Sequence, residues 1–169
     1  MSNLADPFVR ALATLLSASV EFVVVGVGGI NFFAKDPSEA VATRDLDVLL
    51  SPNPEGLGTA LRALDRAGFY FEAGGEPFVD IAHPDALAAV VRAGAAVKVR
   101  SDDGAEIDLM ISMHGFDFEG LAEDAVPFRI SGIEVKVGRL EKLLRSKELS
   151  GRPKDVAFLA MFKARNQES

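Results

Sequence analysis

The chain has 169 residues, of which 49% are hydrophobic and 25% are charged, and its formal net charge is −7 at neutral pH. This length and composition predict one globular domain spanning residues 1–169 and exclude a disordered chain. Cysteine is absent, which excludes disulfides, thiolate metal sites and cysteine nucleophiles. With only two histidines, a histidine-rich metal site is excluded as well.

The distribution of charge bears on location and partners. Residues 1–16 lack the basic start of a signal peptide, and no apolar run approaches the ~20 residues that span a bilayer, so we expect a cytoplasmic protein without a membrane partner. The acidic balance disfavours broad binding of nucleic acid, which depends on neutralising phosphates. Residues 136–154 nevertheless carry seven basic and two acidic side chains. This basic segment is either an ordinary solvated helix face or a place to capture a small polyanion.

The first half of the chain alternates between helical and strand-like patterns. Gly68 directly follows the helical pattern over 55–67 and is a glycine of the kind that ends helices. The patterns predict a helix over 7–18, a buried strand over 21–26, a short helical turn over 30–35, a loop over 36–42, a strand over 44–50, a helix over 55–67 and a short strand over 69–72.

The second half continues in the same way. We expect a helix over 84–93, a hairpin of strands 97–100 and 105–112, a second hairpin of strands 128–130 and 133–137, and helices over 139–149 and 153–164. This order of elements predicts an α+β, or mixed α/β, domain with a mixed sheet. Its core would span about 20–137, and its C-terminal helices about 139–165.

Two acidic residues interrupt the second predicted strand. Asp45 and Asp47 lie two residues apart, so in a strand their side chains point to the same face, with the alpha carbons roughly 7 Å apart. Like charges held together raise each other's pKa unless a cation relieves them. Mg²⁺ accepts such oxygen ligands together with substrate phosphates. The alternative is a strand with one face simply exposed to water.

Asp108 interrupts the apolar strand Ile107-Asp108-Leu109-Met110-Ile111 in the same manner. Aspartate is a poor strand former, so a water-exposed edge explains it as well as a functional site does. A third carboxylate on a neighbouring strand would complete a two-metal site. The three carboxylates together favour metal binding.

Gly28 and Gly29 follow the first buried strand, where glycine lets a phosphate approach the backbone closely. A tight turn without a ligand is the alternative interpretation. A nicotinamide-binding fold is a weak third possibility, because Asn31 stands where its glycine motif requires a third glycine.

Lys147 stands on the predicted inward stripe of the helix over 139–149, after Leu140, Leu143 and Leu144. A lysine at such a position either points its charge into a cleft or extends to solvent at the helix end.

These residues resemble the polymerase-β-type nucleotidyltransferase superfamily. The resemblance rests on Gly28-Gly29, on Thr43-Arg44-Asp45-Leu46-Asp47-Val48 and on Ile107-Asp108-Leu109. The stretch from Ile133 to Asp155 also resembles the small bacterial members, which include the AbiEii-like and minimal nucleotidyltransferases of toxin–antitoxin and abortive-infection systems. The similarity covers roughly residues 20–160.

The resemblance implies a nucleotidyltransferase fold, with a mixed sheet flanked by helices, and a Mg²⁺- or Mn²⁺-dependent enzyme. Such an enzyme moves a nucleoside monophosphate from a nucleoside triphosphate to an acceptor hydroxyl on a protein, an RNA or a small molecule. The resemblance assigns catalysis and metal binding to Asp45, Asp47 and Asp108, and nucleotide binding to Gly28, Gly29, Thr43, Arg44 and Lys147.

The alternative function is non-catalytic. An antitoxin or regulator with the same fold would bind nucleotide or a partner protein, such as a cognate toxin, without turnover.

Overall fold

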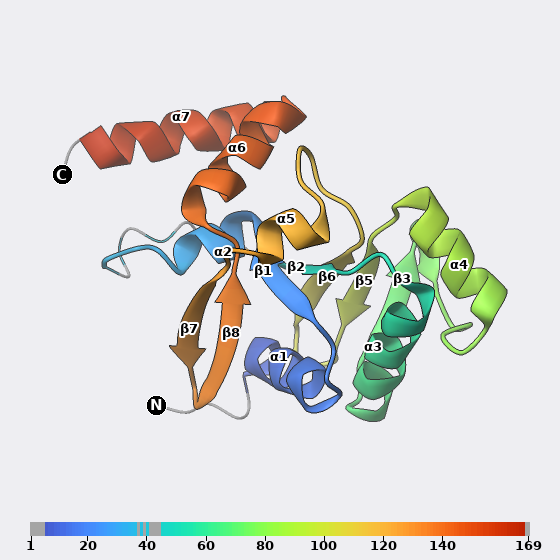
Figure 1. Cartoon of the computed structure of the whole chain (residues 1–169). Helices are drawn as coiled ribbons and strands as arrows, with labels where there is room; N and C mark the ends of the chain where they lie inside the picture. The colour runs from blue at the N-terminus through green and yellow to red at the C-terminus, as the bar shows by residue number, and fades with distance from the viewer. Residues whose placement is uncertain (1–5, 37, 39, 41–44, 168–169) are drawn as a thin grey trace.

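The computed structural model describes residues 6–36, 38, 40 and 45–167. Within them, eight strands form one mixed sheet in the order β4-β3-β5-β6-β2-β1-β8-β7, flanked by helices (Figure 1). The expected mixed α/β class is therefore confirmed. The strands are β1 (Phe22–Val25), β2 (Asp45–Leu50), β3 (Tyr70–Ala73), β4 (Glu76–Pro77), β5 (Val97–Arg100), β6 (Glu106–Met110), β7 (Val126–Ile130) and β8 (Ile133–Val137).

The helices agree with the hydrophobic periodicity, with two differences. The helix expected from residue 30 begins at Gly26, directly after β1, and a short helix at Phe118 was not predicted. This short helix is too brief to show a period, and it begins where the Asp117 carboxylate accepts a hydrogen bond from the backbone N–H of Gly120. The helices are α1 (Pro7–Ser17), α2 (Gly26–Asn31), α3 (Pro54–Arg66), α4 (Pro84–Ala93), α5 (Phe118–Ala122), α6 (Leu140–Ser150) and α7 (Pro153–Gln167).

The order of strands places β2 near the middle of the sheet. It pairs with β1 in antiparallel fashion and with β6 in parallel fashion. Both predicted hairpins are present, β5 with β6 and β7 with β8. The parallel neighbours β2 and β6 are more than fifty residues apart in sequence, and their pairing brings together two segments that the sequence shows only separately.

One face of the central strands is apolar and buried. Val48 on β2, Val99 on β5 and Leu109 on β6 are fully buried, and each directly follows a charged residue. Helices α1 and α3 contribute Leu15 and Leu61 to the same hydrophobic cluster. Burial of each such side chain contributes roughly 1.5–3 kcal/mol to folding. The polar neighbours are consequently directed to the opposite face of the sheet, where the candidate site lies.

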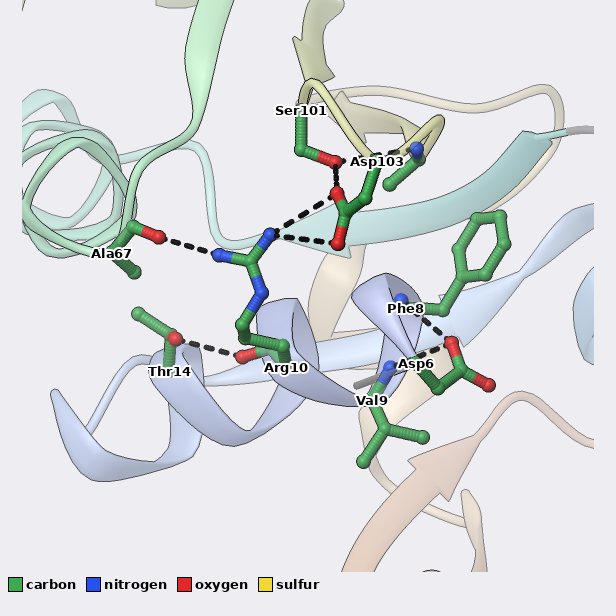
Figure 2. Close-up of polar contacts among 9 residues, drawn as sticks. Asp6, Phe8, Val9, Arg10, Thr14, Ala67, Ser101 and Asp103 are labelled. Atoms are coloured by element: carbon green, nitrogen blue, oxygen red, sulfur yellow. Dashed lines mark hydrogen bonds and ion pairs between the residues drawn. The ribbon is translucent and has the colours of Figure 1, made fainter. Parts of the chain in front are cut away.

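Arg10 on α1 fixes the position of this helix (Figure 2). Its guanidinium donates to the carbonyl of Ala67 and to Asp103 Oδ1, at 3.3 Å for the latter, and lies 4.2 Å from the centre of the Phe69 ring. Asp103 belongs to the turn between β5 and β6 and also accepts a hydrogen bond from Ser101 Oγ. One cation thus connects α1, the end of α3 and the turn that leads into β6.

Helices α6 and α7 lie at the end of the molecule opposite α1 (Figure 1). None of the helices in the described part of the chain has both the length and the apolarity needed to cross a membrane.

Candidate functional site

Three predicted carboxylates lie on one face of two neighbouring strands. In the parallel pairing of β2 with β6, Asp47 is the register partner of Asp108, and Asp45 is the partner of Glu106. Asp45 and Asp47 flank Leu46, whose side chain is buried on the other face. Side chains of register partners share a face, so Asp45, Asp47 and Asp108 lie on the same side of the sheet. The sequence left open whether this face is simply exposed to water or forms a functional site.

Asp47 is ionised only at an electrostatic cost. Burial raises its pKa first, and the negative charges of Asp108 and Asp45 raise it further, to about 6. The positive charge of Lys147 opposes the shift without cancelling it. An ionised Asp47 at neutral pH is therefore held in the folded protein at a cost, which a proton or a cation would remove.

A cleft of about 310 Å³ opens beside Asp47, between the sheet and α6. One side is polar and includes Asp47, Lys147 and Arg152, whereas Met110 and Met113 form an apolar part. Ser146 Oγ on α6 donates to the carbonyl of His114 at 2.7 Å and so ties the helix to the segment that follows β6. Clefts of this kind, with an apolar wall and a few convergent polar groups, are typical of small-molecule sites.

Gly26 is the glycine that makes room for Asp47. Its φ is +67°, and a Cβ there would overlap the Asp47 carboxylate, with Cγ only 2.9 Å away. Gly26 lines the cleft. Gly28 instead lies against the side chain of Leu46, and Gly29 is buried next to Leu143. Both lie within α2 rather than before it, and their nucleotide-binding role stays a prediction. The sequence signal that could have identified Gly26 as part of the site is its position at the end of a buried strand.

Lys147 points into the cleft and does not extend to solvent. Its Nζ lies 3.2 Å from Asp155 Oδ1 and 5.1 Å from the centre of the Phe158 ring. Asp155 is only 2% exposed. The sequence pattern placed Asp155 in the first turn of a helix and gave no sign of its burial, because the contact needs α6 and α7 to fold against each other.

Asp155 has further partners at its second oxygen. Arg152 donates to Oδ2 at 3.0 Å, and Ser150 Oγ donates to the same atom. Burial pushes the pKa of Asp155 upward, but the hydrogen bonds from Ser150 and Lys147 and the charges of Lys147 and Arg152 outweigh it and hold the pKa below its usual value. The basic segment over 136–154 thus contributes two cations to the cleft, and one buried carboxylate holds both of them.

Two cations on β5 also face the acidic residues. Lys98 is the register partner of Asp108, and its Nζ lies 3.6 Å from Asp108 Oδ1. Arg100 pairs with Glu106 at 2.9 Å and with Glu72 at 3.3 Å. Sequence reasoning did not single out these residues, although the alternation Val97-Lys98-Val99-Arg100 shows that they share a face.

The donor set fits a hard divalent cation in its chemistry. Carboxylate oxygens are the ligands that Mg²⁺ and Mn²⁺ prefer, and the raised pKa of Asp47 marks a carboxylate that a cation would stabilise. Across residues 6–36, 38, 40 and 45–167, however, no three His, Asp or Glu side chains are already arranged to hold a metal ion. Thr43 and Arg44, two of the predicted nucleotide-binding residues, lie outside the described residues.

Comparison with known proteins identifies the fold. The chain is similar to the crystal structure of an antigenic nucleotidyltransferase-like protein from Paracoccidioides brasiliensis, with a TM-score of 0.51 and 20% identity over 92% of this chain and 73% of that chain. The fold is nucleotidyltransferase-like. No protein-family model matches the chain, and no curated protein does. The likeness supports the fold of the expected superfamily, while the AbiEii-like branch stays a proposal.

Proposed function

We propose that this chain is a divalent-cation-dependent nucleotidyltransferase, which moves a nucleoside monophosphate from a nucleoside triphosphate to an acceptor hydroxyl. The observation that carries the proposal is the register pair of Asp47 and Asp108, with Asp45 on the same face, beside a cleft that contains Lys147. The nucleotidyltransferase-like fold supports the same reaction class. The acceptor, whether protein, RNA or small molecule, is left open.

In this proposal Asp45 and Asp47 would hold Mg²⁺ or Mn²⁺, and Asp108 would contribute a further oxygen and accept the proton of the acceptor hydroxyl. The acceptor oxygen would bond to the α-phosphorus as pyrophosphate leaves. When bound, the cation would stabilise the charge on the attacking and leaving oxygens of an in-line displacement. The chain itself must hold the triphosphate against an acidic face, and this task falls to the cations across the cleft.

Lys147 and Arg152 are the cations in the best position for the triphosphate. Both line the cleft, and both are held by Asp155, so their charged groups are already ordered before nucleotide arrives. Gly28, Gly29, Thr43 and Arg44 are proposed as additional nucleotide contacts because of the family resemblance. Gly26 leaves the space that the Asp47 carboxylate occupies at the edge of the cleft.

The direct test is turnover. Each of the four nucleoside triphosphates, α-labelled, would be incubated with Mg²⁺ or Mn²⁺, with the protein alone and with RNA or cell extract as acceptor. The proposal expects covalent transfer of label that Asp47→Asn abolishes and that Asp65→Asn, a change on the exposed surface of α3, does not. Transfer that survives Asp47→Asn would contradict it.

A non-catalytic nucleotide-binding or partner-binding protein is the second candidate. The ion pair between Lys98 and Asp108 favours it, because a carboxylate that already has a cation is less available to a metal. Stabilisation by nucleoside triphosphate with no transfer to any acceptor would support this candidate. An antitoxin-type role, with a cognate toxin as partner, belongs with this possibility, and a toxin–antitoxin or abortive-infection setting is proposed for either function.

A further inference from the structure

Four charged residues form a row across the polar face of the sheet. Register partners run from Glu72 on β3 to Lys98 on β5, then to Asp108 on β6 and Asp47 on β2. Lys98 therefore stands between two acidic neighbours, one on each adjacent strand. Its position next to the candidate site follows from strand pairing alone.

The ion pairs on this face decide which neighbour Lys98 neutralises. Glu72 Oε2 lies 3.3 Å from Arg100 Nε, and the same arginine contacts Glu106. The Nζ of Lys98 lies 3.6 Å from Asp108 Oδ1. Because Arg100 pairs with Glu72, Lys98 contacts Asp108, the register partner of Asp47.

The two ends of the acidic group are thus neutralised from different directions. Lys147, from α6, acts on Asp47, but it is shared with the buried Asp155. Lys98, from β5, acts on Asp108. The side chain of Lys98 is 34% exposed and carries its charge on a flexible four-carbon stem, so it can leave Asp108 for solvent without any movement of the backbone.

We propose that Lys98 is a tethered counter-ion that competes with a divalent cation for Asp108 and so sets the cation concentration at which the site fills. This inference rests on the proposed function, since it concerns the same carboxylates. The positive charges of Lys98 and of a divalent cation repel each other at the same carboxylate. Lys98 therefore opposes binding of the cation at Asp108, and removal of the lysine should make binding tighter.

The experiment is a Mn²⁺ titration without nucleotide, in which electron paramagnetic resonance measures free Mn²⁺ for the purified full chain. Lys98→Met is expected to tighten Mn²⁺ binding about two- to fivefold, on the scale of a lost partly exposed ion pair. Lys98→Gln should act in the same direction while it keeps a polar group, and Lys98→Arg should restore wild-type affinity. Lys136→Met is the matched control, because it also removes a strand lysine, but from an exposed position on β8.

A second readout separates competition from loss of folding. Without metal, Lys98→Met leaves Asp108 next to Asp47 without its counter-ion, so the melting temperature of this variant should fall. Saturating Mn²⁺ should then raise the melting temperature of Lys98→Met by more than that of Lys136→Met. Equal or weaker Mn²⁺ binding by both Lys98→Met and Lys98→Gln would overturn the inference.

The failure of the inference and that of the proposed function look different. Wild-type binding that Asp47→Asn abolishes, together with no gain in the Lys98 variants, overturns only the competition. Absence of Mn²⁺ binding in the wild type and in both Lys98 variants overturns the metal site itself, and with it the inference.

Discussion

Asp47 and Asp108 lie directly opposite each other on the parallel strands β2 and β6. Two carboxylates at this position near the middle of a sheet destabilise each other when both are ionised. Burial adds to the cost, and together these effects raise the pKa of Asp47 to about 6. The arrangement is unfavourable for folding alone, and a bound cation would relieve the repulsion.

The first prediction concerns the pH dependence of stability. Because the pKa of Asp47 is about 6 in the folded chain and 3.8 for an ordinary aspartate, the contribution of Asp47 to stability is fully present below pH 3.8 and is lost as the pH rises through 6. Asp47→Asn removes this loss. The variant should be more stable than wild type by about 3 kcal/mol at pH 8 and by about half of that at pH 5.

Urea unfolding at the two pH values measures this difference. Asp65→Asn, at an exposed position of α3, is the control, and its difference in unfolding free energy from wild type should be the same at both pH values. A less stable Asp47→Asn at pH 8 would mean that the carboxylate stabilises the fold, as a structural hydrogen-bond acceptor does.

The second prediction concerns the close approach of Gly26. Gly26→Ala places a methyl group against the Asp47 carboxylate at a φ of +67°, so it should displace Asp47 as well as strain the backbone. Gly74→Ala is the matched control, since Gly74 has a φ of +61° with no atom within 4 Å of the added Cβ. Gly74→Ala should cost about 1 kcal/mol, the backbone effect alone.

Gly26→Ala should cost clearly more and should also weaken stabilisation by Mg²⁺ with nucleoside triphosphate. Both quantities come from thermal melts with and without ligand. Equal losses of stability in the two variants, with ligand stabilisation intact in both, would show that Gly26 has no special relationship to the site.

The third prediction distinguishes the role of Lys147 in nucleotide binding from the role of Asp155 in stability. Asp155→Ala leaves Lys147 and Arg152 in the cleft without their buried carboxylate, and it should destabilise the fold by about 3 kcal/mol or more. Lys147→Met leaves Asp155 with Arg152 and Ser150, so it should cost less stability while it abolishes the effect of nucleotide.

Lys142→Met is the control on the same helix. Lys142 pairs with Glu123 and Asp124, away from the residues that line the cleft. The Lys142→Met variant should change stability without changing the stabilisation by nucleotide. A Lys147→Met variant that keeps the full response would remove Lys147 from the site.

The fourth prediction concerns Arg10, which joins α1, α3 and the turn before β6 (Figure 2). Arg10→Ala should lower the free energy of unfolding by about 1–3 kcal/mol, because it leaves a carbonyl and a carboxylate without this donor. Stabilisation by nucleotide should persist, since the residue lies outside the cleft. Loss of ligand stabilisation at temperatures where the variant is folded would contradict this division.

The sequence predicted much of the secondary structure because each element carries a local signal. The amphipathic α3, followed by Gly68, and the β7–β8 hairpin are examples. The parallel pairing of β2 with β6 carries no local signal, because no hairpin joins these strands, so the register of Asp47 with Asp108 could not be predicted. The burial of Asp155 depends on the packing of α6 and α7, and it was missed for the same reason.

The role of Asp47 as a cation ligand is most directly tested by ligand-dependent melting of wild type and Asp47→Asn. Mg²⁺ with a nucleoside triphosphate at a hundredfold excess over Kd should stabilise the wild type by about 2.7 kcal/mol. The variant should fold, match or exceed the wild type without ligand, and gain nothing from the mixture. A variant that is weaker without ligand, yet gains as much as the wild type from Mg²⁺ and nucleotide, would contradict a metal site on β2.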